Sequence, residues 1–272
     1  YDLEKITPYR YQVYLDEAQI HVDFAPSHQS AVYRLQFEQS EPTHLVFNSR
    51  KGALKVEGNT VQGFQYIDNK TKIYLYVELD KTPEKAGVLA SSAVDYAKQS
   101  AEGENAAVVL SYAGGVGEIG VRYGISLIDE AQAKKNLARE IKDYSVATIA
   151  EAGRKIWNET LGKIAIEGGT EDERTVFYTS LYRTYERPVC LSEDGRYYSA
   201  FDGKIHEDGG RPFYTDDWLW DTYRATHPLR VLIEKEKEGD ILNSFVLMAE
   251  QMGTGWMPTF PEITGDTRRM NS

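Results

Sequence analysis

The sequence predicts an antiparallel β-sandwich followed by a helical region, and two patterns lead to this fold class. Up to about residue 128, apolar and polar side chains alternate in short runs separated by turn residues, which is the period of half-buried strands. From Asp129 onward, apolar residues recur at helical spacing. We therefore expect an all-β domain over residues 1–128 and a mainly helical chain after it.

The strand pattern is clearest over residues 31–38 and 72–79, where alternate side chains are suited to a buried face. Shorter runs over 19–24, 44–48, 106–112 and 119–128 fit the same pattern. Turn signals separate them, such as residues 57–60 and the glycine-rich residues 114–117. About eight short strands at this spacing are typical of a sandwich. Residues 81–105 are polar, and we expect a long loop or an irregular sheet edge there.

Helices are predicted over residues 130–141 and 144–161, followed by a short β-like run over 163–166. Thr170 and Glu173 have the spacing of a capping box, so a helix should start there and run to about residue 186. Residues 189–213 read as a polar, glycine-rich loop. A further helix is expected from Asp217 and another from Gly239.

Composition excludes several classes of protein. The net charge of −11 argues against nucleic acid or an anionic membrane as a partner. The single cysteine, Cys190, excludes an internal disulfide framework and a cysteine-rich zinc site, and between Val189 and Leu191 it reads as a packed apolar residue. No run approaches the length of a membrane span, so we expect no membrane insertion.

Residues 214–228 carry the strongest functional signal. This segment combines two tryptophans with three aspartates, an arginine and a histidine. Aromatic plates beside carboxylates and a guanidinium suit a sugar, whose C–H groups stack on indole while its hydroxyls form charge-assisted hydrogen bonds. The alternative is a helix N-terminus with acidic caps and two packing tryptophans.

Within this segment, spacing suggests which side chains act together. Asp217 and Asp221 are four residues apart and should share a helix face, and Asp221 and Arg224 should do so as well. Asp221 and Arg224 could form hydrogen bonds with vicinal sugar hydroxyls, or could form an ion pair that connects two helices. Trp218, Trp256 and Asp216 are further candidates for sugar contacts. Trp256 lies between glycines in a loop, where it could stack on a ligand or fold back onto the helix end.

Catalytic motifs with local signatures are absent from the sequence, including phosphate-binding glycine loops, Gly-x-Ser-x-Gly and paired-cysteine metal sites. Carboxylates therefore remain the acid–base candidates, and residues 216–221 hold the densest group of them.

Several motifs, taken in order, resemble glycoside hydrolase family 92, the calcium-dependent inverting exo-α-mannosidases. The matching stretches are Arg122-Tyr123-Gly124-Ile125-Ser126, Trp157-Asn158, residues 177–182, Asp194-Gly195-Arg196-Tyr197, Asp202-Gly203-Lys204, Tyr214-Thr215-Asp216, Leu219-Trp220-Asp221-Thr222-Tyr223-Arg224, His227-Pro228 and Gly255-Trp256-Met257-Pro258.

The resemblance implies an N-terminal β-sandwich, linker helices and an (α/α)6 catalytic barrel, here over residues 1–128, 129–166 and 167–272. It implies hydrolysis of terminal α-linked mannose from glycans, with calcium at the sugar site between the two domains. A glutamate would protonate the leaving oxygen and an aspartate would activate water. It weakly favours an extracytoplasmic location.

The chain departs from the family pattern at both ends. The family's Gly/His-rich opening segment is missing, and the chain stops where the barrel has only begun. We therefore expect the catalytic acid, the catalytic base and most calcium ligands beyond Ser272, and we expect the 272-residue chain to be inactive alone. Two alternatives remain open: a non-catalytic carbohydrate-binding or structural module, and another glycosidase or phosphorylase with a sandwich and a helical barrel.

Overall fold

The computed structural model describes residues 1–91 and 93–266 and divides into two compact units. Unit 1 contains residues 1–67 and 72–157, and unit 2 contains residues 68–71 and the chain from residue 158 onward. The division falls inside the helix α2 (Val146–Leu161).

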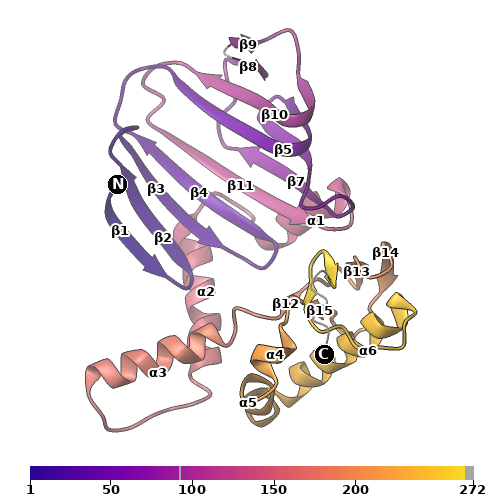
Figure 1. Cartoon of the computed structure of the whole chain (residues 1–272). Coiled ribbons are helices and arrows are strands. Elements are labelled where there is room, and N and C mark those ends of the chain that lie inside the picture. Colours follow the sequence, from indigo (N-terminus) through magenta and orange to yellow (C-terminus); the bar gives the residue numbers. More distant parts are fainter. Residues whose placement is uncertain (92, 267–272) are drawn as a thin grey trace. The chain divides into compact units, whose positions relative to one another are not determined.

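Unit 1 is built on one antiparallel sheet of eleven strands, in the order β1-β2-β3-β4-β11-β7-β6-β5-β10-β8-β9 (Figure 1). The strands are β1 (Asp2–Thr7), β2 (Arg10–Leu15), β3 (Ile20–Pro26), β4 (Ser30–Phe37), β5 (Thr43–Glu57), β6 (Thr60–Tyr66), β7 (Lys72–Leu79), β8 (Lys85–Ala90), β9 (Ala93–Asp95), β10 (Ser100–Tyr112) and β11 (Glu118–Ser126).

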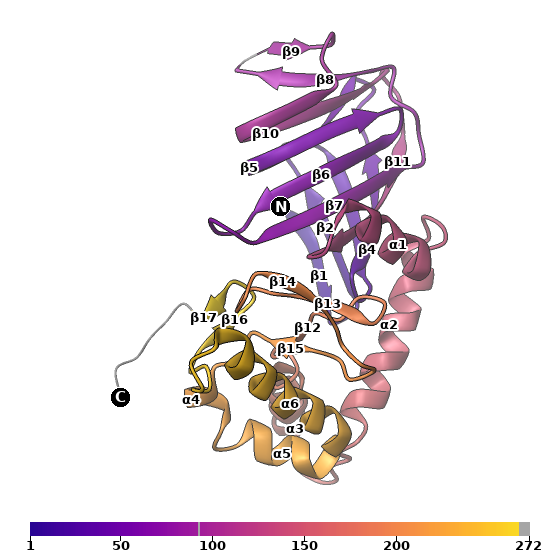
Figure 2. The ribbon, with the colours of Figure 1, turned by 90° about the vertical axis from the view of Figure 1, so that its right-hand side faces the viewer.

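The sheet is strongly curled, so that β5, β6, β7 and β10 lie over β2, β3 and β4 (Figure 2). The prediction of an antiparallel β domain is confirmed. One feature differs from a sandwich of two separate sheets: the ladder of backbone hydrogen bonds runs without a break, because β11 pairs with β4 on one side and with β7 on the other.

The inner face of the curled sheet forms the main core. Side chains at alternate positions point into it, as the period-2 pattern requires; on β7, for example, Val77 and Leu79 are 1% and 0% exposed. The buried members come from strands on both sides of β11 and from β11 itself, and they are Phe37, Leu54, Val56, Val61, Val77, Leu79, Val88, Val108, Leu110, Tyr112, Ile119 and Val121.

A second core lies on the opposite face of the sheet, where α1 (Glu130–Glu140) and the start of α2 pack against it. Asp129 caps α1 by accepting a hydrogen bond from the Gln132 backbone N–H at 2.7 Å. Ala133 and Leu137 then point at the sheet and are 0% and 2% exposed. Gly124 on β11 allows this close approach, since a Cβ there would lie 2.3 Å from the carbonyl oxygen of Ala133.

Gly124→Ala is therefore expected to lower the free energy of unfolding by about 1–3 kcal/mol, because the added methyl group must push the helix away from the sheet. Urea unfolding followed by tyrosine and tryptophan fluorescence measures this change. The matched control is Gly239→Ala, where the nearest atom to the new Cβ lies 3.9 Å away and a gain of about 0.5–1 kcal/mol is expected. An unchanged midpoint for Gly124→Ala would contradict the close contact.

Unit 2 contains the end of α2, the helices α3 to α6 and three small two-stranded sheets. Its helices are α3 (Glu171–Arg183), α4 (Leu219–Thr222), α5 (Thr226–Ile233) and α6 (Lys235–Met252). The sheets pair β12 (Val189–Cys190) with β15 (Tyr214–Thr215), β13 (Arg196–Ser199) with β14 (Lys204–Glu207), and β16 (Pro261–Glu262) with β17 (Gly265–Asp266).

The predicted capping box of α3 is present, with the Thr170 hydroxyl accepting from the Glu173 backbone and the Glu173 carboxylate accepting from the Thr170 backbone. Among the described residues, no helix is both long enough and apolar enough to cross a bilayer.

Residues 81–105 contain β8, β9 and the first part of β10, and β8 and β9 end the strand order, so the expected sheet edge is confirmed and the long loop is not. Four other local predictions are wrong. Residues 189–213, expected to be a loop, contain β12, β13 and β14. Residues 163–166 form no strand. The helix expected from Asp217 is only the single turn α4, and the helix expected from Gly239 already starts at Lys235.

Candidate carbohydrate-binding site

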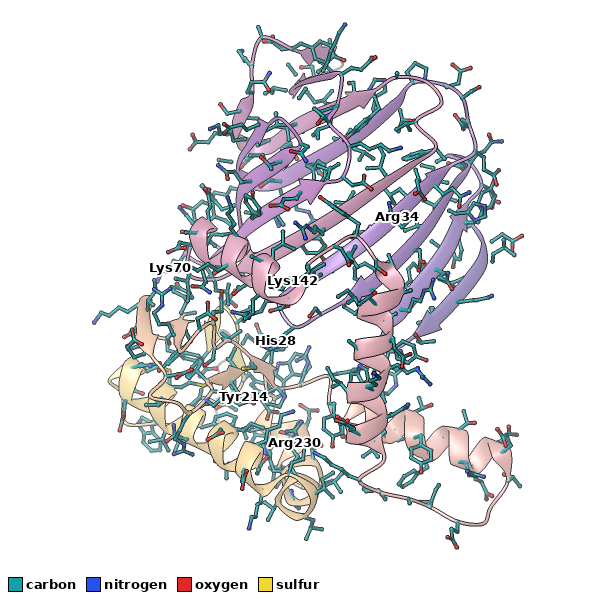
Figure 3. All side chains as sticks on the ribbon, turned by 180° about the vertical axis from the view of Figure 1, so that it is seen from behind. His28, Arg34, Lys70, Lys142, Tyr214 and Arg230 are labelled. Carbon is teal, nitrogen blue, oxygen red and sulfur yellow. The ribbon has the colours of Figure 1, made fainter. Side chains whose placement is uncertain are left out.

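The segment with the strongest functional signal is a sharp turn followed by one turn of helix. Tyr214 and Thr215 form β15, which pairs with β12. Asp216 then adopts a left-handed conformation with φ of 65°, which few residues other than glycine, asparagine and aspartate tolerate. This turn interrupts the extended chain, and α4 follows at Leu219–Thr222. Figure 3 labels Tyr214 on β15, the first residue of the segment, and Arg230 on α5, which follows the segment in sequence.

Asp216 is half-buried and faces Arg187, whose Nε lies 3.7 Å from the Asp216 Oδ2. Burial raises the pKa of the Asp216 carboxyl, and the charge of Arg187 partly opposes this.

Trp218 is half-buried, and protein groups cover much of its indole. The guanidinium of Arg187 lies 4.2 Å from the ring centroid, and Phe260 meets the ring edge-on at 6.2 Å. These contacts favour a packing role for at least one face of Trp218.

Two further tryptophans lie at the surface. Trp220 is 54% exposed and Trp256 is 79% exposed, so both can offer an aromatic face to a ligand. Asp221 and Arg224 are exposed as well. Trp220 was not among the residues predicted from the sequence, although the spacing of two tryptophans around Leu219 was a signal that could have found it.

Asp221 and Arg224 do not share a helix face, because α4 ends at Thr222 and Arg224 lies beyond it. The Arg224 Nε instead donates to the Tyr223 hydroxyl at 2.6 Å, and the guanidinium lies 5.4 Å from the centroid of that ring. The alternative of an ion pair between Asp221 and Arg224 thus finds no support, since Arg224 turns to its neighbour Tyr223. Both charged groups are therefore accessible to a ligand.

Asp217 lies outside the helix and is 0% exposed, so the prediction that it shares a helix face with Asp221 is wrong. Its Oδ1 accepts a hydrogen bond from the Thr222 hydroxyl at 2.9 Å. Its Oδ2 lies 3.2 Å from the Nε2 of His227. Asp217 is thus a structural anchor of the turn rather than a group presented to a ligand.

His227, at the start of α5, also contacts Glu238 on α6, with Nδ1 2.7 Å from Oε1. The nearby Asp217 carboxylate raises the pKa of the His227 imidazole, against the effect of burial. Neither His227 nor Glu238 was predicted from the sequence as a site residue. Glu238 sits in a run of alternating lysine and glutamate that gives no sign of burial.

Cys190 is half-buried, and burial raises the pKa of its thiol. A raised pKa is the opposite of what a nucleophilic thiol needs.

Over residues 1–91 and 93–266, no group of three or more histidine, cysteine, aspartate or glutamate side chains could hold a metal ion. These residues therefore supply no calcium site built from three such side chains.

Comparison with known proteins shows which family the chain resembles. A model of the glycosyl hydrolase family 92 N-terminal domain matches residues 1–126. A model of the glycosyl hydrolase family 92 catalytic domain matches residues 132–272. A search of curated protein sequences gives no significant match.

Three solved structures illustrate the similarity. The inverting mannosidase BT2199 from Bacteroides thetaiotaomicron VPI-5482 is 26% identical, with a TM-score of 0.84 over 94% of this chain and 36% of that one. The family 92 glycosyl hydrolase ccman5 is 25% identical, with a TM-score of 0.81 over 93% of this chain and 38% of that one. The α-mannosidase BT3965 from Bacteroides thetaiotaomicron, at 22% identity and a TM-score of 0.86 over 97% of this chain and 38% of that one, supports the fold alone.

The chain thus spans 36–38% of the length of these proteins. Because the two family models together match nearly all of its residues and do so in order, the chain belongs to glycosyl hydrolase family 92, as part of such an enzyme that comprises its N-terminal domain and the beginning of its catalytic domain.

Proposed function

We propose that the protein containing this chain is an exo-acting α-mannosidase that releases terminal α-linked mannose from glycans by an inverting, calcium-assisted mechanism. The observation that carries the proposal is the match of both family domains in order, together with 26% identity to an inverting mannosidase over 94% of the chain. The catalytic acid, the catalytic base and most calcium ligands would come from parts of the enzyme other than the residues described above.

Within this proposal, the turn at residues 216–224 contributes to the mannose site. Asp221 and Arg224 would bind sugar hydroxyls by charge-assisted hydrogen bonds, and their exposure leaves both available. Trp256 would stack on the sugar, which its 79% exposure permits. Trp218 and Asp216 would hold the site in place, since Arg187 contacts the ring of one and the carboxylate of the other.

The surface of unit 2 supports a continuation of the helical domain. Leu232 is 82% exposed, and three further apolar side chains on α5 and α6 are at least 44% exposed: Val231, Leu242 and Val246. Exposed apolar groups gathered on neighbouring helices indicate a surface that other protein covers. We propose that later helices of an (α/α)6 barrel cover it.

The test uses the protein at the full length that its gene encodes, incubated with α-linked mannobioses. Release of mannose is expected, with the β-anomer formed first when the product is followed by NMR. A chelator should abolish release, and added calcium should restore it. β-Linked mannobiose is the control for stereochemistry. Dependence on added phosphate would instead support a phosphorylase, and sugar binding without turnover would support a non-catalytic module.

A further inference from the structure

Four ionisable side chains of unit 2 are buried together behind the candidate sugar site. The side chains of Asp217, Glu238 and Arg230 are 1%, 2% and 3% exposed, and that of His227 is 11% exposed. Two carboxylates in such a place require two positive charges, because an uncompensated buried charge is strongly unfavourable. Arg230 supplies one, and its Nη1 lies 4.0 Å from the Asp217 Oδ2. A protonated His227 completes the balance within this cluster.

The geometry around the imidazole agrees with the charged form. Its Nδ1 lies 2.7 Å from the Glu238 Oε1. Its Nε2 lies 3.2 Å from the Asp217 Oδ2 and 3.2 Å from the Thr222 Oγ1. A neutral imidazole carries one N–H and can donate on one side only, whereas the imidazolium donates on both. Since carboxylates lie on both sides, the imidazolium is the form that matches its surroundings.

These contacts hold both ends of the turn that presents the candidate sugar contacts. Asp217 precedes α4, and Thr222 is its last residue. The Thr222 hydroxyl donates to Asp217, and His227 connects the pair to Glu238 on α6. Trp218, Trp220 and Asp221 lie between the two ends. Loss of the charge at His227 would therefore affect these three residues indirectly, through the two ends of the segment.

We propose that protonated His227 is a positioning residue, which fixes the segment from Asp217 to Thr222 against α5 and α6 and lets it loosen when the proton is lost. The sugar-binding consequence rests on the proposed function, whereas the positioning itself does not. The groups that face the imidazole are Asp217 and Thr222 from the segment and Glu238 and Phe245 from α6. Arg230, on the same helix as His227, interacts with Asp217 and so acts on the imidazole indirectly.

The sign of the pH dependence follows from the direction of the pKa shift. The pKa of His227 is raised in the folded state. Its contribution to stability is therefore complete below the unfolded value of about 6.5 and is lost as the pH rises through the folded value. The segment should be ordered below about pH 6.5 and should loosen as the pH rises through the folded pKa of His227.

Fluorine NMR of the full-length protein labelled with 5-fluorotryptophan tests this directly. The signals of Trp218 and Trp220, assigned by tryptophan-to-phenylalanine variants, are expected to move with one common midpoint above about pH 6.5, while Trp157 in α2 stays unchanged. In His227→Gln this transition should disappear, and the two signals should resemble the alkaline wild type at every pH. The matched control is His206→Gln, whose imidazole lies 3.0 Å from Asp202 and whose loss should leave the transition intact.

A charge-balance experiment separates positioning by charge from simple packing. His227→Gln should lower the melting temperature at a mildly acidic pH, because it leaves two buried carboxylates with one cation. Adding Glu238→Gln removes the excess negative charge, so the double variant should melt above His227→Gln. A double variant whose loss equals the sum of the two single losses would overturn the proposal, since it would show independent packing contributions.

Steady-state kinetics as a function of pH provide a third test. KM for an aryl α-mannoside should rise about tenfold through the same pH midpoint, the loss expected for about one hydrogen bond, while kcat changes less. If no mannoside is hydrolysed but both fluorine signals follow the midpoint, the proposed function fails and the positioning role stands. If the enzyme is active but Trp218 and Trp220 do not respond to pH or to His227→Gln, the positioning role is wrong.

Discussion

The 272-residue chain, expressed by itself, is expected to release no mannose from an aryl α-mannoside in the presence of calcium. Inverting hydrolysis needs a protonated acid and a base on opposite faces of the sugar, with their carboxyl groups roughly 6.5–9.5 Å apart. Each of the two groups supplies about 10²–10⁴-fold of the rate. A chain without such a pair should show only background hydrolysis.

Two of the three carboxylates of the candidate site are committed to other contacts. Asp217 is buried against His227, and Asp216 faces Arg187. Asp221 is exposed, but neither of these neighbouring aspartates can serve as its opposing partner. The structure thus gives a physical reason for the expected inactivity that the spacing in the sequence did not provide.

Purified chain is assayed beside the full-length protein at equal molar concentration. The full-length protein is the positive control, and a buffer blank defines the background. Steady turnover by the chain, abolished by Asp221→Asn, would place the catalytic carboxylates inside these residues and would refute the expectation.

Asp221→Ala in the full-length enzyme is expected to lower kcat/KM by roughly 10² or more, because bonds that tighten in the transition state affect kcat/KM more strongly than their ground-state strength suggests. Asp221 is presented at the surface by the one-turn helix α4, and its carboxylate can accept hydrogen bonds from sugar hydroxyls. Because the side chain is exposed, its removal should leave the fold intact.

The control is Glu207→Ala, which removes an exposed carboxylate on β14. It should leave kcat/KM within about twofold of wild type, in line with the small effects of surface substitutions. Circular dichroism and thermal melting verify that both variants are folded. Near-wild-type turnover by a folded Asp221→Ala enzyme would remove Asp221 from the mannose site.

Strands with a clear period-2 pattern were predicted well, for a reason visible in β7. Val77 and Leu79 enter the main core, while Tyr76 on the opposite face enters the second core beside α1. Both faces are covered, yet alternation survives because the two faces bury different kinds of side chain. The pattern therefore reports strand structure even where neither face is open to water.

The strands over residues 81–105 could not be predicted in this way. The six residues of β8 include two alanines and a glycine, and the first part of β10 is polar and exposed. β8 and β9 pair with each other, whereas β10 pairs with residues 43–55 of β5, much earlier in the chain. Such segments become strands because a neighbouring strand offers hydrogen bonds, which a local pattern does not reveal.

For the candidate site, residue types located the segment but not its geometry. A helical spacing was assumed from Asp217, whereas the left-handed Asp216 and the buried Asp217 delay the helix until Leu219. Asp217 instead pairs with His227, which lies on the next helix. Side-chain contacts of this kind are tertiary, so spacing within one helix could not give them.

The position of β11 sets the order in which the sheet can be completed. β11 is the last strand of the domain in the sequence, yet it separates β1 to β4 from β5 to β10. Until residue 126 has left the ribosome, the two groups lack their shared strand and each exposes one long unpaired edge. Closing the sheet then joins β4 to a segment about ninety residues away, and such a high contact order is typical of domains that fold in milliseconds to seconds rather than microseconds. During that interval both edges can pair with another chain, so a chaperone that covers them should increase the yield of folded protein.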